Sequence, residues 1–293
     1  MGPLFFLIFY NDLPFTLDCA IDAYADDSTM SATGENVETI AQVLTDNCAR
    51  VSDWMRDNKF KLNADKTHIL TVGTGERLKT LDKLVEAKMD GVVLKETDEK
   101  CELLLGIQIQ SNLKWHKTLQ ELQSKLQKRL AGLAKLRYIV PYTMLKIITQ
   151  GIFNSILIYC LPLFGGCDKG EISALQVLQN KAAPRSPRNF MFERLGWFSV
   201  NQLIVYHTLI AVFKIRNSGE PEFLATSLNK DNVVNGHILL PKQNLTLAEK
   251  SFTFRGAKAW NLLPFHMRTL VKIGCFKKEL KKWVKENVPR FLD

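Results

Sequence analysis

The stretch AIDAYADDSTM at residues 20–30 is the starting point for interpreting this chain. A short apolar run leads into YADD at residues 24–27, and β-compatible Ser and Thr follow, so the pattern predicts a strand, a tight turn and a second strand. Asp tolerates turn geometry, and a turn brings Asp26 and Asp27 near one point. Mg2+ prefers carboxylate oxygens, and two-metal sites hold their ions ~3.5–4 Å apart. The stretch predicts either a metal-holding turn or, as the simpler alternative, a hairpin turn with two solvated acids.

Charge is distributed unevenly along the 293 residues, whose net charge is +9. Residues 1–70 carry 5 Lys+Arg against 11 Asp+Glu, whereas residues 111–293 carry 28 against 11. An acidic head joined to a long basic body suits a polyanionic partner such as nucleic acid. The alternative is a basic protein with solvated lysines, and charge alone does not separate the two.

Cysteine spacing and apolar runs argue against zinc binding, secretion and membrane insertion. The six cysteines are scattered without a C-x-x-C pair, which favours reduced intracellular thiols. The apolar start at residues 1–10 lacks a basic n-region and ends at Asn11, unlike a signal peptide. Polar residues, Pro162 and glycines interrupt the apolar stretch at 147–166, which falls short of the roughly 20 apolar residues of a membrane span. We expect a soluble intracellular protein, nuclear or cytoplasmic, without a membrane partner.

Helical periodicity dominates the chain after residue 35. It predicts helices over 36–54, 116–137, 143–159, 172–182, 197–216 and 275–287, and strands over 67–72 and 103–111. A glycine inside the second strand, Gly106, predicts a bulge or a close backbone approach. Residues 76–102 indicate a hairpin or loop, and residues 218–250 indicate a loop. Trp115, Trp260 and Trp283 are expected to anchor the core.

Several short motifs follow one another in the order found in one family. They are GPLFFLIFYNDLP at 2–14, YADD at 24–27, LN with KT at 62–67, LGI with L and W at 105–115, and FRGAKAWNLLP at 254–264. The series resembles the reverse transcriptases of non-LTR retrotransposons, the LINE-type and jockey-like elements. Each motif is short, but the resemblance covers nearly the whole chain with the family's spacing.

The resemblance implies an α+β fold with three parts. Residues 1–110 would form a partial right-hand polymerase palm, an antiparallel sheet with helices. Residues 111–217 would form a helical thumb or connection, and residues 218–293 a basic helical C-terminal region. The implied activity is RNA-directed DNA polymerisation on an RNA template and a DNA primer, in which two Mg2+ ions, or Mn2+, stabilise the attacking oxygen and the leaving pyrophosphate.

The resemblance also implies roles for individual residues. Asp26 and Asp27 would hold metal, with Asp26 the stronger ligand, and Lys66 would protonate or steady the leaving group. The residues expected to contact nucleic acid are Tyr24, Ala25, Gly106, Lys125, Lys128 and Arg129. The basic helices over 116–137 and 275–287 would contact phosphates without reading sequence. The alternatives are a solvated lysine at Lys66, a plain bulge at Gly106 and solvated faces on both helices.

One departure from the family affects catalysis. The family's palm takes a further aspartate from an earlier strand, and its fingers bind the nucleotide, but both would precede Gly2. We therefore expect an N-terminally truncated fragment that is catalytically incomplete alone, with an unpaired sheet edge and exposed apolar surface. The alternative function is a non-catalytic nucleic-acid-binding remnant acting through residues 111–293. A small secreted protein led by residues 1–20 is a third hypothesis.

Overall fold

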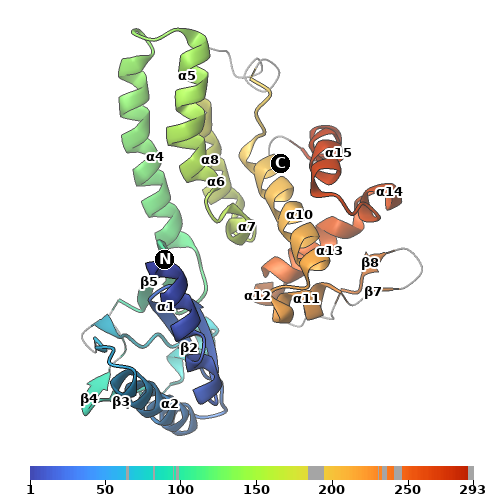
Figure 1. Cartoon of the computed structure of the whole chain (residues 1–293). Helices are drawn as coiled ribbons and strands as arrows, with labels where there is room; N and C mark the ends of the chain where they lie inside the picture. The colour runs from blue at the N-terminus through green and yellow to red at the C-terminus, as the bar shows by residue number, and fades with distance from the viewer. Residues whose placement is uncertain are drawn as a thin grey trace. The chain divides into compact units, whose positions relative to one another are not determined.

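The chain is α+β and mostly helical. Its computed structural model describes residues 1–63, 66–81, 83–94, 96, 99–183, 195–229, 231–232, 236–240 and 246–289. Two compact units, Met1–Lys114 and Trp115–Asp293, make up the fold (Figure 1). The described strands form four separate two-stranded antiparallel sheets. The predicted α+β class is therefore confirmed, with small hairpins in place of one continuous sheet.

The first unit contains short hairpins around one long helix. Its elements are α1 (Gly2–Tyr10), the 3-10 helix η1 (Leu13–Thr16), β1 (Ala20–Tyr24), β2 (Asp27–Ser31), α2 (Val37–Asp57), α3 (Gly75–Lys79), β3 (Ala87–Met89), β4 (Val92–Leu94), β5 (Cys101–Leu104) and β6 (Ile107–Gln110). The predicted helix over 36–54 is confirmed as α2, which begins where the Asn36 side chain accepts a 2.8 Å hydrogen bond from the Thr39 backbone.

Helix α2 holds the first unit together because its apolar stripe contacts two groups of side chains. Near its middle, Cys48 packs with Ala87 and Met89 of β3. Towards its C-terminal end, Val51 packs with Tyr10 and Leu13. By contrast, α1 is almost entirely apolar but exposes most of its side chains, Ile8 among them. The group around Val51 also includes Ile21 of β1 and Met30 of β2, so this packing holds the β1–β2 hairpin against α2.

The predicted strand over residues 67–72 is wrong. Within this segment only Ile69 forms a β-bridge, to Glu96. The backbone N–H of Thr71 donates to the Glu96 carboxylate at 3.1 Å, and that of Gly73 donates to the Ser111 carbonyl at 2.9 Å. These two backbone groups each have a single partner from a distant part of the chain, and no ladder of strand hydrogen bonds runs along 67–72 among the residues that the structure describes.

The predicted continuous strand over 103–111 is also wrong, because the chain reverses direction within it. Strand β5 pairs with β6, and Leu104 lies opposite Ile107 across a two-residue turn. Both turn residues have positive φ, +48° at Leu105 and +81° at Gly106, as a type I′ turn requires. Gly106 therefore serves a hairpin turn and is not a bulge inside a strand.

We expect Gly106→Ala to destabilise the first unit by about 1–2 kcal/mol, because an L side chain strains a left-handed backbone. A Cβ at this position would meet no atom within 4 Å, so the loss would report backbone strain alone. Urea unfolding followed by circular dichroism measures the change. Gly75→Ala is the matched control, since Gly75 also has open space but lacks positive φ. Equal stability of the two variants would contradict the strain argument.

The second unit is almost entirely helical. Its elements are α4 (His116–Leu136), α5 (Tyr142–Thr149), the π-helical turn η3 (Gln150–Asn154), α6 (Ser155–Ile158), α7 (Leu161–Phe164), α8 (Lys169–Ala182), α10 (Val200–Ser218), α11 (Glu222–Leu228), β7 (Asp231–Asn232), β8 (His237–Ile238), α12 (Thr246–Glu249), α13 (Phe252–Asn261), α14 (Phe265–Arg268) and α15 (Ile273–Asn287). The helices predicted from periodicity are confirmed, with that over 143–159 divided into α5, η3 and α6. The loop predicted over 218–250 is wrong in part, because α11 packs the buried Leu228 into the core.

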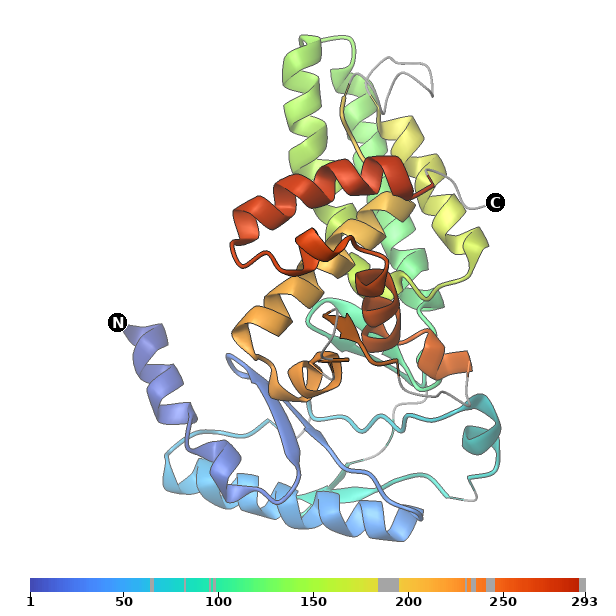
Figure 2. The same ribbon diagram turned by 90° about the vertical axis from the view of Figure 1, so that its right-hand side faces the viewer.

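Helix α10 contributes buried side chains to both hydrophobic cores of the second unit. Its gold ribbon crosses the middle of that unit in Figure 2. Val200 and Ile204, near its start, belong to the first core, where α10 packs against α7 and α8. Val212 and Phe213, further along, pack with α13 and α15. The second core therefore contains buried side chains from before residue 217, such as Phe213, and from after it, such as Leu228. Ser199 begins the helix with a capping box, and Gly219 ends it with a left-handed φ of +76°.

The motif FRGAKAWNLLP at residues 254–264 is part of this packing. The Arg255 guanidinium donates to the carbonyls of Lys250 at 3.0 Å and Pro162 at 2.7 Å, which fastens α13 to α7. The Asn261 side chain accepts from the backbone N–H of Ile238 and donates to its carbonyl, both at 2.8 Å. Trp260 is 2% exposed, as expected of a core anchor. These motif residues stabilise the fold.

Candidate functional site

The YADD residues lie at the tip of the β1–β2 hairpin. Tyr24 and Asp27 are a cross-strand pair, and Ala25 and Asp26 form the two-residue turn between them. Only Ala25 of these two has positive φ, +54°, the pattern of a type II′ hairpin turn. Both carboxylates are exposed. The predicted strand–turn–strand is therefore confirmed, and the small Ala25 side chain lies beside the acids.

The inner face of this hairpin is attached to the helices of the first unit. Ile21 and Met30, which are cross-strand partners, pack around Tyr10, Leu13 and Val51. The Tyr10 hydroxyl lies 2.7 Å from the Ser28 hydroxyl, one residue beyond Asp27. Tyr10 is 7% exposed, and its ring lies edge-on to that of Trp54 on α2. Sequence reasoning missed this support, because only pairing in space brings Tyr10 beside residue 28.

The outer face of the hairpin carries a third carboxylate. Asp22 lies opposite Thr29, so it shares a face with Tyr24 and Asp27. Within the described ranges, however, no group of three or more Asp, Glu, His or Cys side chains is arranged to hold a metal ion. Two-metal sites clamp both the attacking and the leaving oxygen. Asp26 and Asp27 supply too few ligands for that arrangement, so the described residues do not fit a complete two-metal centre.

Two other predicted site residues of the first unit, Lys66 and Gly106, lie outside the β1–β2 hairpin. Lys66 is exposed, and its backbone N–H donates to the Asn63 carbonyl at 3.2 Å. None of the ion pairs between described residues joins Lys66 to Asp26 or Asp27. Gly106 belongs to the β5–β6 turn described above. The structure therefore brings together residues 24–27 and shows no ion pair between Lys66 and the two aspartates among the residues it describes.

The remaining predicted residues belong to the second unit. Lys125, Lys128 and Arg129 are exposed on α4, and the buried Leu122 and Leu126 lie on its inner face. On α15, the lysines at 277, 278, 281, 282 and 285 are all exposed, and Phe276, Leu280 and Val284 are buried. Both helices thus carry a basic solvent face above an apolar core face.

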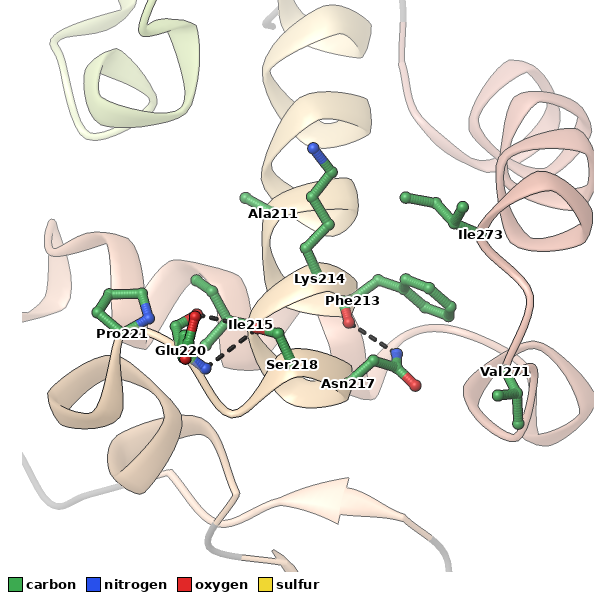
Figure 3. A pocket seen from close by; sticks show the side chains of 10 residues that line it. All are labelled: Ala211, Phe213, Lys214, Ile215, Asn217, Ser218, Glu220, Pro221, Val271 and Ile273. Carbon is green, nitrogen blue, oxygen red and sulfur yellow. Dashed lines mark hydrogen bonds between the residues drawn. The ribbon is translucent and has the colours of Figure 1, made fainter. Parts of the chain in front are cut away.

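An open groove of about 1010 Å³ follows the C-terminal half of α10 (Figure 3). Phe213, Val271 and Ile273 give it an apolar wall. Two of its four polar side chains bond to backbone at the end of the helix: the Asn217 amide donates to the Phe213 carbonyl at 2.7 Å, and the Ser218 hydroxyl accepts from the Glu220 backbone at 3.1 Å. The lining contains no His, Cys or Asp side chain.

Three titrating groups with a shifted pKa lie in packed regions away from the turn. Burial raises the pKa of Cys48 to about 11 and that of Cys167 to about 12, the latter with a contribution from Glu171. Burial also lowers the pKa of His207, with the Lys277 charge acting in the same direction. These shifts mark structural burial, because each group packs inside a helical or hairpin core. All six cysteines are free thiols.

No family model, curated protein or solved structure matches this chain. Among the residues that the structure describes, no helix combines the length and apolar character needed to cross a membrane.

Proposed function

We propose that the chain is the palm and thumb part of an RNA-directed DNA polymerase of the non-LTR retrotransposon type. The observation that carries the proposal is the YADD turn. Its two adjacent carboxylates are exposed at the tight turn of a hairpin, and the inner face of that hairpin packs against a long helix. The order of the five motifs along the sequence supports the same assignment.

The proposal gives the residues of the turn distinct tasks. Asp26 and Asp27 offer carboxylate oxygens to Mg2+ near the primer end, and Mg2+ supplies charge stabilisation in phosphoryl transfer. The small Ala25 leaves room for the primer to approach. The hydrogen bond between Tyr10 and Ser28 positions the hairpin, because Tyr10 also packs against Val51 of α2. Since two carboxylates are too few for a complete centre, we assign no reaction step to these residues alone.

Nucleic acid binding without catalysis is the second candidate function. It is favoured by the exposed basic faces of α4 and α15 in a unit that carries 27 Lys+Arg against 11 Asp+Glu over residues 115–293. Lysine and arginine contacts to phosphates provide affinity that does not depend on base sequence. Both candidates share this property, and they differ in whether the turn supports nucleotide transfer.

Primer extension separates the two candidates. We expect no incorporation by this chain on an RNA template with a DNA primer, in Mg2+ or Mn2+, because its acids do not complete a metal centre. We also expect Asp26→Ala to leave template–primer affinity unchanged. Asp22→Ala is the matched control, since Asp22 lies on the same hairpin two residues before Tyr24. Incorporation that is lost in Asp26→Ala but kept in Asp22→Ala would overturn the expectation and establish polymerase activity.

A further inference from the structure

The turn between α4 and α5 exposes large apolar side chains. Tyr138 is 85% exposed and Ile139 is 76% exposed in the turn itself, and Met144 and Ile147 on α5 are 57% and 69% exposed. We call these four residues the apolar tip. All four lie within ten residues, and clustered apolar surface of this kind marks an interaction site.

The exposure of the apolar tip is a consequence of packing beneath it. The backbone N–H groups of Ile139 and Val140 both donate to the Leu136 carbonyl at 3.0 Å. The Arg137 guanidinium donates to the carbonyls of Lys181 and Ala183 at the end of α8. These bonds fix the turn, which joins α4 to α5 at one end of the helical hairpin (Figure 1), and Tyr138 and Ile139 remain exposed on it.

Charge around the apolar tip defines the partner. From residue 116 to residue 149 the chain has seven Lys and Arg and one acid, Glu121. Lys128, Arg129 and Lys135, which precede the tip on α4, are exposed. The partner must therefore be a polyanion that also offers apolar groups. Single-stranded nucleic acid has both, because its unpaired bases stack on aromatic rings while its phosphates meet basic side chains.

We propose that the apolar tip binds unpaired bases of single-stranded nucleic acid, with Tyr138 as the stacking platform and Ile139 beside it. The proposal rests on nucleic acid binding by the second unit and adds the form of nucleic acid preferred. Exposed lysines on α4 contact the phosphates on either side of the stacked base. The exposed lysines of α15 add phosphate contacts that do not depend on unpaired bases, so they do not distinguish single strands from duplex.

Fluorescence anisotropy with the full chain tests this proposal. The probes are a short single-stranded oligonucleotide, a blunt duplex of the same sequence, inorganic polyphosphate, and vesicles with and without phosphatidylserine. The test variant is Tyr138→Ala/Ile139→Ala, and Tyr138→Phe keeps the stacking ring. Phe223→Ala is the matched control, because Phe223 is an exposed aromatic residue on α11, 67% exposed. Circular dichroism verifies that each variant is folded.

We expect the double variant to lose about tenfold or more in affinity for the single strand and to stay within about twofold for polyphosphate. Tyr138→Phe and Phe223→Ala should both bind like the wild type. An unchanged affinity for the single strand, or an equal loss for polyphosphate, would overturn the proposal. So would tip-dependent binding to phosphatidylserine vesicles that is tighter than binding to the single strand. Wild-type protein that binds neither nucleic acid probe would defeat the proposed function as well, whereas tip-independent binding defeats only this inference.

Discussion

Trp260→Ala is expected to lower the free energy of unfolding of the second unit by about 3–5 kcal/mol. The indole is 2% exposed and stacks on Phe276 with ring centroids 5.8 Å apart. Its N–H donates to the Gly236 carbonyl at 3.2 Å, and the Arg216 guanidinium lies 5.2 Å from the ring centroid. Removing the side chain leaves a cavity between α10, α13 and α15 and removes both polar contacts. Urea unfolding followed by far-UV circular dichroism gives the value.

Two comparison variants separate the cavity from the loss of a tryptophan as such. Trp260→Phe keeps an aromatic ring against Phe276 and should cost less than the alanine variant. Trp283→Ala removes a side chain that is only partly buried at the edge of the same core, so its cost should also be smaller. A loss below about 1 kcal/mol in Trp260→Ala would contradict the role of Trp260 as a core anchor.

Reversing three charges on α4 is expected to produce the largest change in nucleic acid binding. In Lys125→Glu/Lys128→Glu/Arg129→Glu, we expect template–primer affinity to fall about 100-fold or more at low salt, because each charged hydrogen bond to a phosphate is worth about 1.5–3 kcal/mol. The slope of log affinity against log salt should fall by about 0.9 for each phosphate contact removed. Titrations at several salt concentrations measure both quantities.

The matched control changes the same number of charges in the first unit. Arg77, Lys79 and Lys88 are all exposed there, outside both basic helices. Their reversal to Glu should leave the salt slope unchanged, although net charge falls equally. A similar loss in the control would mean that affinity follows overall charge, and the specific contribution of α4 would be refuted. Lys277→Glu/Lys278→Glu/Lys281→Glu tests α15 in the same way.

The candidate site could be predicted from the sequence only in part. Residues 24–27 form the expected turn, because apolar and β-compatible residues flank a short polar pair. The hydrogen bond between Tyr10 and Ser28 could not be predicted, since it joins residues 18 positions apart and needs α1 to lie beside β2. The role of Arg255 was equally hidden, because its acceptors include a carbonyl 93 residues away.

The sequence by itself determined the long helices and the hairpin turn of this protein. Periodic apolar residues define α2, α4, α10 and α15, because helical side chains three and four apart share one face whatever lies opposite. Tertiary structure decided the short segments. Residues 67–72 look like a strand, but the backbone of Thr71 bonds to Glu96 and that of the following Gly73 bonds to Ser111. Residues 103–111 reverse at Leu105 and Gly106. Short segments carry too few side chains to fix their own pairing, so the partner that reaches their backbone determines their structure.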